Sequence, residues 1–493
     1  MRRLAFATAL AAALVLPAAT LAGSRVAAAS RFDNTEPYAA KQWYLEQDSA
    51  WSYWPTQPQL FPVRVAVIDS GIDGGHPEFQ GRVVAARTFV GGSAYRDEQG
   101  HGTFVAGEIA ANPANGLGIA GIAFNAQLMI AKVVGPDGNV SLAGEVAAIH
   151  WAVDNGARVI NLSLGGVRDP LNSSLDTYSP LEQAAVEYAV SKGVVVVAAV
   201  GNGPQSPKTP WPFAHYPAAL PHVIGVSAVR QNGSVPVYSN RDAVYNDIAA
   251  PGDAIFSTIP RQLTESRAGC EDHPYSDCGS FEFRDAIGTS FAAPQVSAAA
   301  ALLLGQNPRL TASQVAWILE RSADDANAGT RCAQCPTGRD LYTGWGTLDI
   351  ESALTMASDG TKLPAPDRYE PNDDAGVWAH ALPPLPRTID ATLDFWDDNV
   401  DVYRVHLNAR ARLFARSTPS VAANVRLALW APGTKRVGAL DVDLSDRLAL
   451  STRTGAQARL SYRAAKAGVY YLEVRLLSRP RASVSYRLAL ARG

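Results

Sequence analysis

The sequence predicts an α/β protein with a doubly wound, mostly parallel sheet and helices on both faces, followed by a small antiparallel β-sandwich domain. Three observations support this prediction. From residue 63 to 357, short apolar runs rich in β-branched residues alternate with longer helical stretches. A polar stretch containing Gly, Pro and Lys follows at 358–368. From residue 369 onward, short apolar runs continue with no long helical stretch between them.

Five apolar runs are the predicted strands of the parallel sheet, because continuous apolarity is typical of strands that are buried on both faces. These runs are Val63–Asp69, Gln127–Val134, Arg158–Leu164, Val194–Val200 and Val223–Val229. Helices are predicted at 103–111, 142–155, 181–192, 291–304 and 312–321. Thr311 and Gln314 form a capping box that starts the last helix. Gly193 and Gly305 lie where helix C-caps are expected.

The β-sandwich is predicted to occupy the C-terminal part of the chain. Its strands are expected at Ala391–Phe395, Asp401–Leu407, Val425–Trp430, Gly468–Leu476 and Ser483–Leu490. The expected domain organisation is a signal peptide at 1–29, a Trp-, Tyr- and Pro-rich lead-in at 30–60, the α/β domain at 61–357, a linker at 358–368 and the β-sandwich at 369–493.

Composition and charge limit the class of protein. The 493 residues are 47% hydrophobic and 18% charged, which excludes a mainly disordered chain. The formal net charge of -3 gives no electrostatic argument for a nucleic-acid partner.

The N-terminus has the pattern of a secretory signal. Two arginines follow Met1, an apolar stretch runs from Leu4 to Leu16, and small residues continue to Ala29, with cleavage expected after Ala22 or Ala29. The apolar stretch is shorter than the ~20 residues that a membrane-spanning helix needs, and no later segment is long and apolar enough. We therefore expect a secreted protein without a membrane span; an uncleaved membrane anchor is the alternative.

Export makes the four cysteines candidates for disulfides, because thiols outside the cytoplasm are oxidised. Four cysteines allow three pairings. Cys270 and Cys278 lie close together in one polar loop, and Cys332 and Cys335 form a C-x-x-C motif, so we expect these two local pairs. The alternatives are a metal site, which lacks a histidine at finger-like spacing, and a redox motif, which would open a helix after a strand.

Three short segments contain an acid, a histidine and a serine at predicted element boundaries. Asp69 ends an apolar run, and open α/β sheets bind their ligands at the carboxyl ends of strands. His101 opens one predicted helix, and Ser290 stands at the start of another. Taken singly, the three are also typical of a turn former, a packed histidine and a helix N-cap. Together, in this order and flanked by glycines, they favour a serine nucleophile whose histidine base is oriented by a carboxylate.

Five stretches follow one another between residues 60 and 355: AVIDSGIDGGHPEF, HGTFVAG, VINLSLGG, GVVVVAAVGN and GTSFAAP. In type and order they resemble the subtilisin-like serine proteases, the subtilases. The resemblance implies a subtilisin-like fold, peptide-bond hydrolysis through an acyl-enzyme, and Asp69, His101 and Ser290 as the catalytic triad. It also implies Asn202 as the side-chain donor of the oxyanion hole. An amide just after a buried strand suits that role, although Asn202-Gly203 alone is typical of a turn.

Subtilases hold an extended peptide between two backbone segments, and the matching stretches here are 138–140 and 163–165. The resemblance thus implies polypeptide substrates, with Gly138, Asn139, Ser163, Leu164, Gly165 and Gly203 as binding residues. The wall of the main pocket is expected to include part of Trp211–His215. Backbone pairing carries little sequence preference. No cofactor is required for the chemistry.

Three features depart from the family pattern. The second histidine of the usual HGTH motif is Phe104 here, which we expect to pack rather than react. The acid that helps to bind calcium in many members is Glu78, and the companion loop Asn112–Gly118 is one residue longer, so a structural calcium ion is left open and no metal ligands are assigned. The lead-in is shorter than the pro-domain that secreted members usually carry.

The tail resembles the bacterial pre-peptidase C-terminal domain in three stretches, Tyr369–Asp374, Asp398–Val405 and Gly468–Val474. Its acidic residues either hold a calcium ion or form unpaired surface turns. A surface or matrix ligand for this domain is also left open.

These features favour a secreted, monomeric serine endopeptidase of broad substrate range. A maturation protease with few substrates, similar to the mycosins of bacterial secretion systems, fits the short lead-in, but mycosins usually end in a membrane helix. An inactive scaffold whose β-domain binds surfaces is the third reading, and the complete set of four catalytic residues argues against it.

Overall fold

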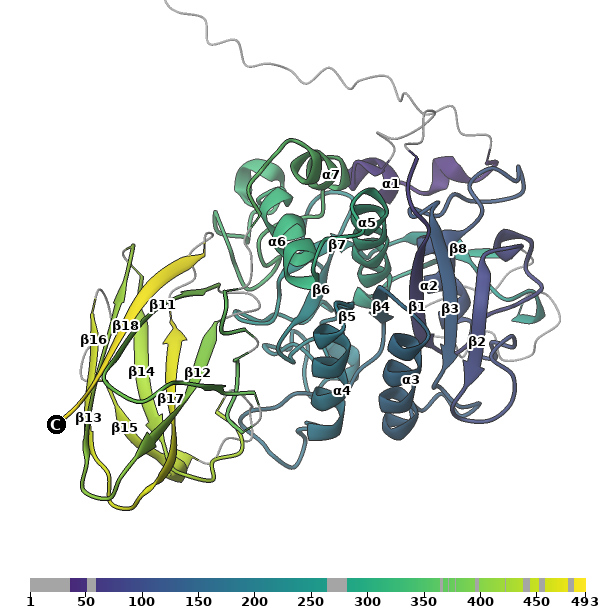
Figure 1. Cartoon of the computed structure of the whole chain (residues 1–493). Coiled ribbons are helices and arrows are strands. Elements are labelled where there is room, and N and C mark those ends of the chain that lie inside the picture. The colour runs from purple at the N-terminus through teal and green to yellow at the C-terminus, as the bar shows by residue number, and fades with distance from the viewer. Residues whose placement is uncertain are drawn as a thin grey trace, which may run out of the picture.

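The computed structural model describes residues 36–493 apart from 51–58, 264–281, 364–366, 371, 377, 395–398, 422, 438–443, 452–456 and 478–482. Figure 1 shows two parts of different architecture: an α/β part, and a C-terminal part in which strands predominate. This is the fold class that the sequence predicts.

A seven-stranded parallel sheet forms the centre of the α/β part, in the order β2-β3-β1-β4-β5-β6-β7. Its strands are β1 (Val63–Asp69), β2 (Val83–Thr88), β3 (Ala126–Lys132), β4 (Val159–Leu162), β5 (Val195–Ala199), β6 (Val223–Val229) and β7 (Ile248–Pro251). Strands β2 and β3 lie on one side of β1 and β4 to β7 on the other. The strand order therefore changes direction beside β1, which is where sheets of this type bind ligands.

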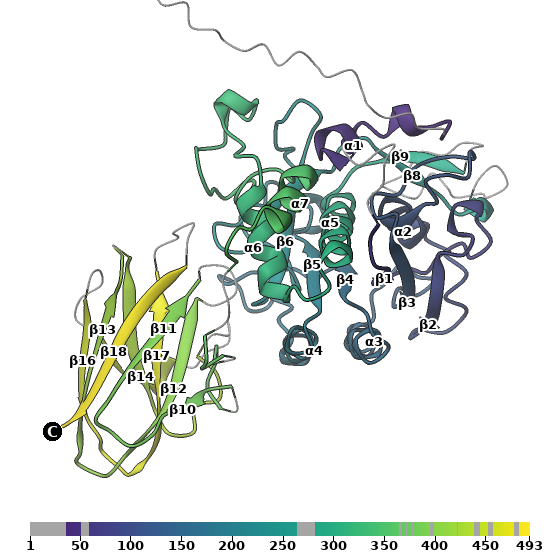
Figure 2. The same ribbon diagram turned by 45° about the horizontal axis from the view of Figure 1, so that its top comes forward.

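Helices cover both faces of the sheet (Figure 2). One face carries α3 (Leu142–Asp154) and α4 (Pro180–Ser191), and the other carries α2 (His101–Ala110), α5 (Ala293–Gln306), α6 (Ala312–Ser322) and α7 (Ile350–Ser358). Side chains of β1 alternate between the two cores, as the pleat of a strand requires. Val65 and Val67 pack toward α2 and α5, and Ala66 and Ile68 pack toward α3 and α4.

The ten elements predicted for this part are present, and their ends lie within two residues of the expected positions. The capping box of α6 is confirmed by two reciprocal hydrogen bonds of 3.2 Å between Thr311 and Gln314. Gly193 follows α4 with a φ of 75°. Gly305, in contrast, lies inside α5 and is not a C-cap. A Cβ at this position would stand 3.0 Å from the Phe61 carbonyl oxygen and 2.2 Å from Asn125 Nδ2, so close approach explains the glycine.

The strands β2 and β7 and the helix α7 were not predicted, and neither were two further features of the α/β part. β8 (Ile255–Thr258) and β9 (Phe283–Ala286) form a separate antiparallel pair. The lead-in contains η1 (Ala39–Lys41) and α1 (Tyr44–Gln47), and the side chains of Tyr44 and Leu45 belong to the main core.

The C-terminal part is a sandwich of two sheets, in the orders β10-β12-β17-β14-β15 and β11-β18-β13-β16. The strands are β10 (His380–Ala381), β11 (Arg387–Leu393), β12 (Val400–Leu407), β13 (Arg412–Pro419), β14 (Val425–Trp430), β15 (Arg447–Leu450), β16 (Ala458–Arg463), β17 (Gly468–Leu476) and β18 (Val484–Arg492). All pairs are antiparallel except β10 with β12. No helix among the described residues is long and apolar enough to cross a membrane.

Candidate active site

Asp69 and His101 meet at the carboxyl end of β1. Asp69 is the last residue of the strand and 2% exposed, and His101 is the first residue of α2. Nδ1 of His101 lies 2.8 Å from Oδ1 and 2.9 Å from Oδ2 of Asp69. Gly102 makes this approach possible, because a Cβ there would stand 2.3 Å from the Gly71 carbonyl oxygen. The fold thus brings a carboxylate and an imidazole into direct hydrogen-bond contact.

Asp97, a buried acid that sequence reasoning missed, fixes the turn before α2. Its carboxylate accepts hydrogen bonds from the hydroxyls of Ser70 and Thr103 and from the backbone N–H groups of Gln99, Gly100 and Thr103. Ser70 Oγ in turn accepts a bond of 2.8 Å from Gly102 N–H. These bonds tie the residue after Asp69 to the first turn of α2. The only signal in the sequence for this role of Asp97 is its position shortly before the start of a helix. Acids in that position are common and often lie on the surface, so the signal does not single out Asp97.

Lys132, which was also missed, supports the same corner from the end of β3. Its side chain is buried, and Nζ donates hydrogen bonds of 2.9 Å to the carbonyl oxygens of Ser70 and Arg96. Nζ also pairs with the Glu98 carboxylate. A buried lysine charge is tolerable only because these oxygen atoms surround it.

Ser290 lies in η7 (Thr289–Phe291), immediately before α5. Its Oγ donates to the Ser163 carbonyl oxygen at 3.2 Å, and Ser163 Oγ donates to the Ser290 carbonyl oxygen at 2.7 Å. These reciprocal bonds fix Ser290 against the segment that leaves β4. Ser290 and His101 line the same cleft, and the ring centroid of Phe291 lies 5.4 Å from that of His101.

Phe104 packs beneath this site. Its side chain is fully buried, and its ring centroid lies 4.5 Å from that of Phe291. The aromatic ring therefore fills space under the His101 end of the cleft, as expected for a packing residue.

Asn202 follows β5 and is held by Thr289. The Asn202 amide oxygen accepts bonds from the Thr289 backbone N–H at 2.9 Å and from Thr289 Oγ1 at 3.2 Å. Because the oxygen is occupied in this way, the amide nitrogen is the atom left to act toward a ligand. A fixed amide N–H beside a nucleophile is a suitable donor to an oxyanion.

The cleft has a volume of about 370 Å³. The expected site residues that line it are Asp69, His101, Gly138, Ser163, Leu164, Gly165, Asn202 and Ser290. Two further residues that were expected to bind substrate, Asn139 and Gly203, are not in its lining. The Asn139 side chain instead bonds Asp137 at 2.7 Å, and a Cβ on Gly203 would stand 2.5 Å from Thr209 Oγ1.

His215 also lines the cleft, from the stretch 211–215 that was expected to reach the pocket wall. Its Nε2 lies 2.8 Å from Ser206 Oγ. Burial lowers the pKa of His215 to about 4, so its ring is neutral at pH 7. This part of the wall is therefore polar but uncharged.

Opposing effects set the basicity of His101. Burial lowers its pKa, whereas the charge and hydrogen bond of Asp69 and the charge of Asp97 raise it. The net result is a pKa above the ordinary value of 6.5. An imidazole in this setting is a stronger base than a free one, and its protonated form is stabilised by the neighbouring carboxylate.

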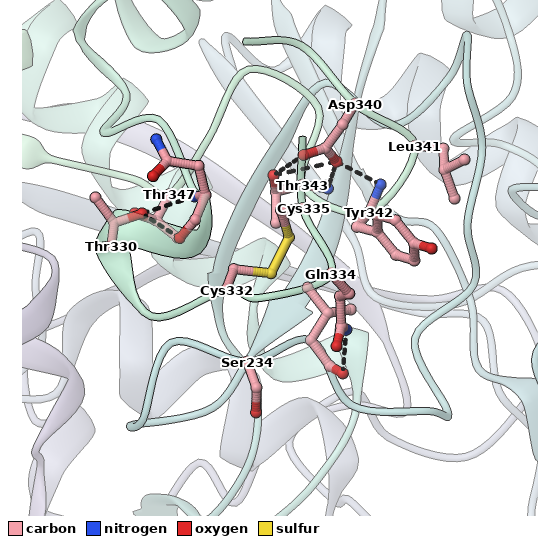
Figure 3. Close-up of a disulfide and its surroundings, with 12 residues drawn as sticks. Ser234, Thr330, Cys332, Gln334, Cys335, Asp340, Leu341, Tyr342, Thr343 and Thr347 are labelled. Carbon is pink, nitrogen blue, oxygen red and sulfur yellow. Dashed lines mark hydrogen bonds between the residues drawn. A yellow bond between two sulfur atoms is a disulfide. The ribbon is translucent and has the colours of Figure 1, made fainter. Parts of the chain in front are cut away.

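A disulfide joins Cys332 to Cys335 in the loop between α6 and α7 (Figure 3). Both side chains are buried and pack with Val229 and Val235. The loop is further ordered by Asp340, whose carboxylate accepts the backbone N–H bonds of the two residues that follow Leu341. The other expected pair, Cys270 and Cys278, lies outside the described residues.

Within the described residues, no three His, Cys, Asp or Glu side chains are arranged to hold a metal ion. The tail nevertheless contains a mixed set of oxygen donors, Glu370, Asn372 and Asp401. Asn372 and Asp401 are fully buried, and each of the three residues has a side-chain oxygen without a hydrogen-bond partner. Burial and neighbouring carboxylates raise the pKa of Glu370 to about 10 and that of Asp401 to about 8. Carboxylate and amide oxygens are the kind of ligand that a hard cation such as Ca²⁺ takes, and these three would supply part of its six to eight ligands.

Comparison with known proteins gives a consistent match for the α/β part. Residues 62–346 match the model of the Subtilase family. Subtilisin DY of Bacillus licheniformis is 36% identical over 292 residues, which cover 59% of this chain and 90% of that protein. Subtilisin E of Bacillus subtilis is 35% identical over 291 residues, with 59% and 65% covered. Among solved structures, a protease from Pseudoalteromonas arctica PAMC 21717 superposes with a TM-score of 0.53 at 26% identity, covering 66% of this chain and 99% of that one.

Proposed function

This chain belongs to the subtilase family and is a serine endopeptidase, and we propose that Asp69, His101 and Ser290 are its catalytic triad. The observation that carries the proposal is the 2.8 Å contact between His101 Nδ1 and Asp69, in a cleft that Ser290 also lines. The sequence motifs predict the same three residues, with Ser290 as the nucleophile, His101 as the base and Asp69 as the orienting carboxylate.

In the proposed reaction, Ser290 Oγ attacks the carbonyl carbon of the scissile peptide bond. His101 Nε2 takes the hydroxyl proton while Asp69 holds Nδ1–H and stabilises the imidazolium. Collapse of the tetrahedral intermediate breaks the C–N bond, and His101 returns the proton to the leaving amine. Water then enters, loses a proton to His101 and attacks the ester carbonyl. The bond between this carbon and Ser290 Oγ breaks, and His101 returns the proton to Oγ, which releases the acid and regenerates the free hydroxyl.

Asn202 is proposed to stabilise the charge that develops on the carbonyl oxygen. The support is the pair of bonds from Thr289 to its amide oxygen, which leave the nitrogen to donate. A donor that is fixed before the reaction gives its stabilisation without reorganisation, which is why such groups contribute strongly to turnover.

Polypeptides in extended conformation are the proposed substrates, and the extracellular space is the proposed location. Gly138 and the segment 163–165 line the cleft. Backbone pairing of these segments with a peptide would depend little on the peptide's side chains. The signal pattern at 1–29 and the disulfide between Cys332 and Cys335 both suit an exported protein.

Hydrolysis of casein and of a short chromogenic peptide by the parent and by Ser290→Ala tests the proposal. We expect the variant to lose on the order of 10⁶-fold in turnover. The matched control is Ser191→Ala, an exposed serine on α4, which is expected to leave turnover unchanged. Substantial activity of Ser290→Ala would contradict the triad. Cleavage of the peptide without casein would instead favour a protease with few substrates.

We also propose that the structural calcium ion left open by the acidic tail sequences takes part of its ligands from Glu370, Asn372 and Asp401. The support is the set of buried oxygen atoms without partners. Titration calorimetry with CaCl2 on the Ser290→Ala protein tests this. Glu370→Gln should abolish one binding event, while Asp390→Asn, an exposed acid of the same domain, should not. Equal calcium binding by both variants would overturn the assignment.

A further inference from the structure

The lead-in segment 36–50 contacts the loop 112–118 of the α/β domain through the buried carboxylate of Glu36. Glu36 is 4% exposed. Its carboxylate accepts hydrogen bonds from three successive backbone N–H groups, those of Gly116 at 2.9 Å, Leu117 at 3.1 Å and Gly118 at 3.2 Å. Charge-assisted bonds of this kind are stronger than bonds between neutral groups.

A second carboxylate, that of Glu78, binds the same loop. Glu78 is fully buried, and its two oxygen atoms accept bonds from the Ile119 backbone N–H at 3.3 Å and from Asn115 Nδ2 at 3.2 Å. The backbone N–H of Asn112 also bonds the Glu78 carbonyl oxygen at 2.9 Å. The loop 112–118 is therefore fixed at both ends and along its middle.

These contacts do not fit the calcium ion that the family pattern leaves open at Glu78 and this loop. Calcium needs six to eight oxygen ligands directed at one point. Here the loop presents N–H groups to the carboxylates, and one of its carbonyl oxygens, that of Gly118, accepts the Tyr38 backbone N–H at 2.9 Å. Donors with a partial positive charge occupy the carboxylate oxygens that a cation would require.

The rest of the segment is built into the domain. The Gln42 side chain is buried and makes two bonds of 2.8 Å with the backbone N–H and carbonyl oxygen of Ala120. Trp43 Nε1 donates to the Ala254 carbonyl oxygen at 2.8 Å, and the Asp48 carbonyl oxygen accepts the Ile350 N–H at 2.8 Å. Loss of this segment would leave the loop and part of the core without partners.

We propose that Glu36 secures the loop 112–118 in place of a calcium ion, and that maturation of this protease therefore leaves Glu36 on the mature chain. The lead-in is a structural clamp and not a segment to be removed. This inference does not rest on the identity of the triad.

Hydrogen exchange of peptides that cover 112–120 tests the clamp, in the Ser290→Ala background so that self-digestion does not interfere. Exchange should be equal in CaCl2 and in EGTA. Because only the exchange of this loop is compared, calcium bound by the tail does not enter the comparison. Glu36→Gln should speed exchange at Gly116, Leu117 and Gly118 by about tenfold or more. The matched control is Glu46→Gln, an exposed acid of the same segment, which should leave the loop unchanged.

Two results of the exchange experiment would overturn the proposal. One is faster exchange of the loop in EGTA than in CaCl2 in the Ser290→Ala protein itself, a comparison that needs no Glu36 variant to fold. The other is loop exchange in Glu36→Gln that equals that of Glu46→Gln. The intact mass of the secreted, active enzyme is an independent check. We expect a first residue at or before Glu36, and a mature chain that begins after Glu36 would contradict the clamp.

Discussion

Burial lowers the pKa of His101, and two carboxylates of different kinds raise it above its ordinary value. Asp69 contacts the imidazole directly, whereas Asp97 acts through its charge and through the turn that precedes α2. Neither effect of Asp97 is visible in the sequence, because its hydrogen-bond partners include Ser70, which lies 27 residues away. Asp97 is thus a positioning residue for the proposed reaction.

The pH dependence of kcat/KM tests this arrangement. Activity should rise with pH as His101 loses its proton, and since its pKa is raised, the midpoint should lie above pH 6.5. Asp97→Asn removes a charge that raises this pKa, so the midpoint should move to lower pH. Asp154→Asn, an exposed acid on α3, is the control and should not move it. A profile that is flat between pH 5 and 9 would argue against His101 as the base, and an unmoved midpoint in Asp97→Asn would contradict the effect of Asp97 on its pKa.

Asn202 allows a second prediction for a single residue. Asn202→Ala should lower kcat by roughly 10²–10³-fold with little change in KM, because the lost donor acts mainly on the transition state. Initial rates over a range of peptide concentrations give both constants. Asn172→Ala, an exposed asparagine in a turn, serves as the control. A loss of less than about tenfold in kcat would mean that another group supplies the oxyanion donor.

Among the elements, the central strands and helices could be predicted because their apolar periodicity is strong and local. β2 was missed because it is an edge strand with only partly buried side chains, so its pattern is weak. β8 and β9 pair across a gap in sequence that no local pattern bridges. The lead-in helices are too short to show a periodic pattern. Contacts between residues far apart in sequence stabilise them, such as that between Gln42 and Ala120, which are 78 residues apart.

Gly305 gives a test at the scale of one helix. Local propensity alone predicts that Gly→Ala inside a helix stabilises a protein by roughly 0.5–1 kcal/mol. The Phe61 carbonyl oxygen would lie 3.0 Å from the new Cβ, so we expect Gly305→Ala to destabilise the domain by about 1–3 kcal/mol instead. Urea unfolding of the Ser290→Ala protein with and without the change measures the sign. A stabilised variant would show that the close approach of Phe61 to Gly305 has no energetic consequence.

At the scale of the whole molecule, ion pairs join the two parts, among them the largely buried pair of Arg321 and Asp394, whose charged atoms lie 3.7 Å apart. Arg436 bonds Glu187 at 2.7 Å, and His222 and Asp373 lie 3.5 Å apart. Pairs of this kind contribute about 0–1 kcal/mol when partly exposed. None of these six residues is in the lining of the cleft.

We therefore predict that a chain ending at Asp359 keeps its turnover of a short chromogenic peptide. What it should lose is stability, attachment or access to large substrates, which a parallel casein assay reports. Circular dichroism establishes that the shortened protein is folded. A folded but inactive protein would show that the β-sandwich is part of the active unit.

The candidate site was predictable to the extent that its residues lie in short motifs. Asp69, His101 and Ser290 each stand at an element boundary among glycines, and that local pattern is readable. Lys132 and Glu36 are not readable in this way, because each acquires its role only when the fold brings distant backbone groups around a buried charge.

The central claim is that Ser290 is the nucleophile activated by His101, and labelling with a fluorophosphonate tests it most directly. Mass mapping of the labelled protein should find one adduct, on Ser290, and His101→Ala should slow its formation strongly because the base is missing. An adduct on a different serine, or an enzyme that hydrolyses peptides but takes no label, would contradict the account.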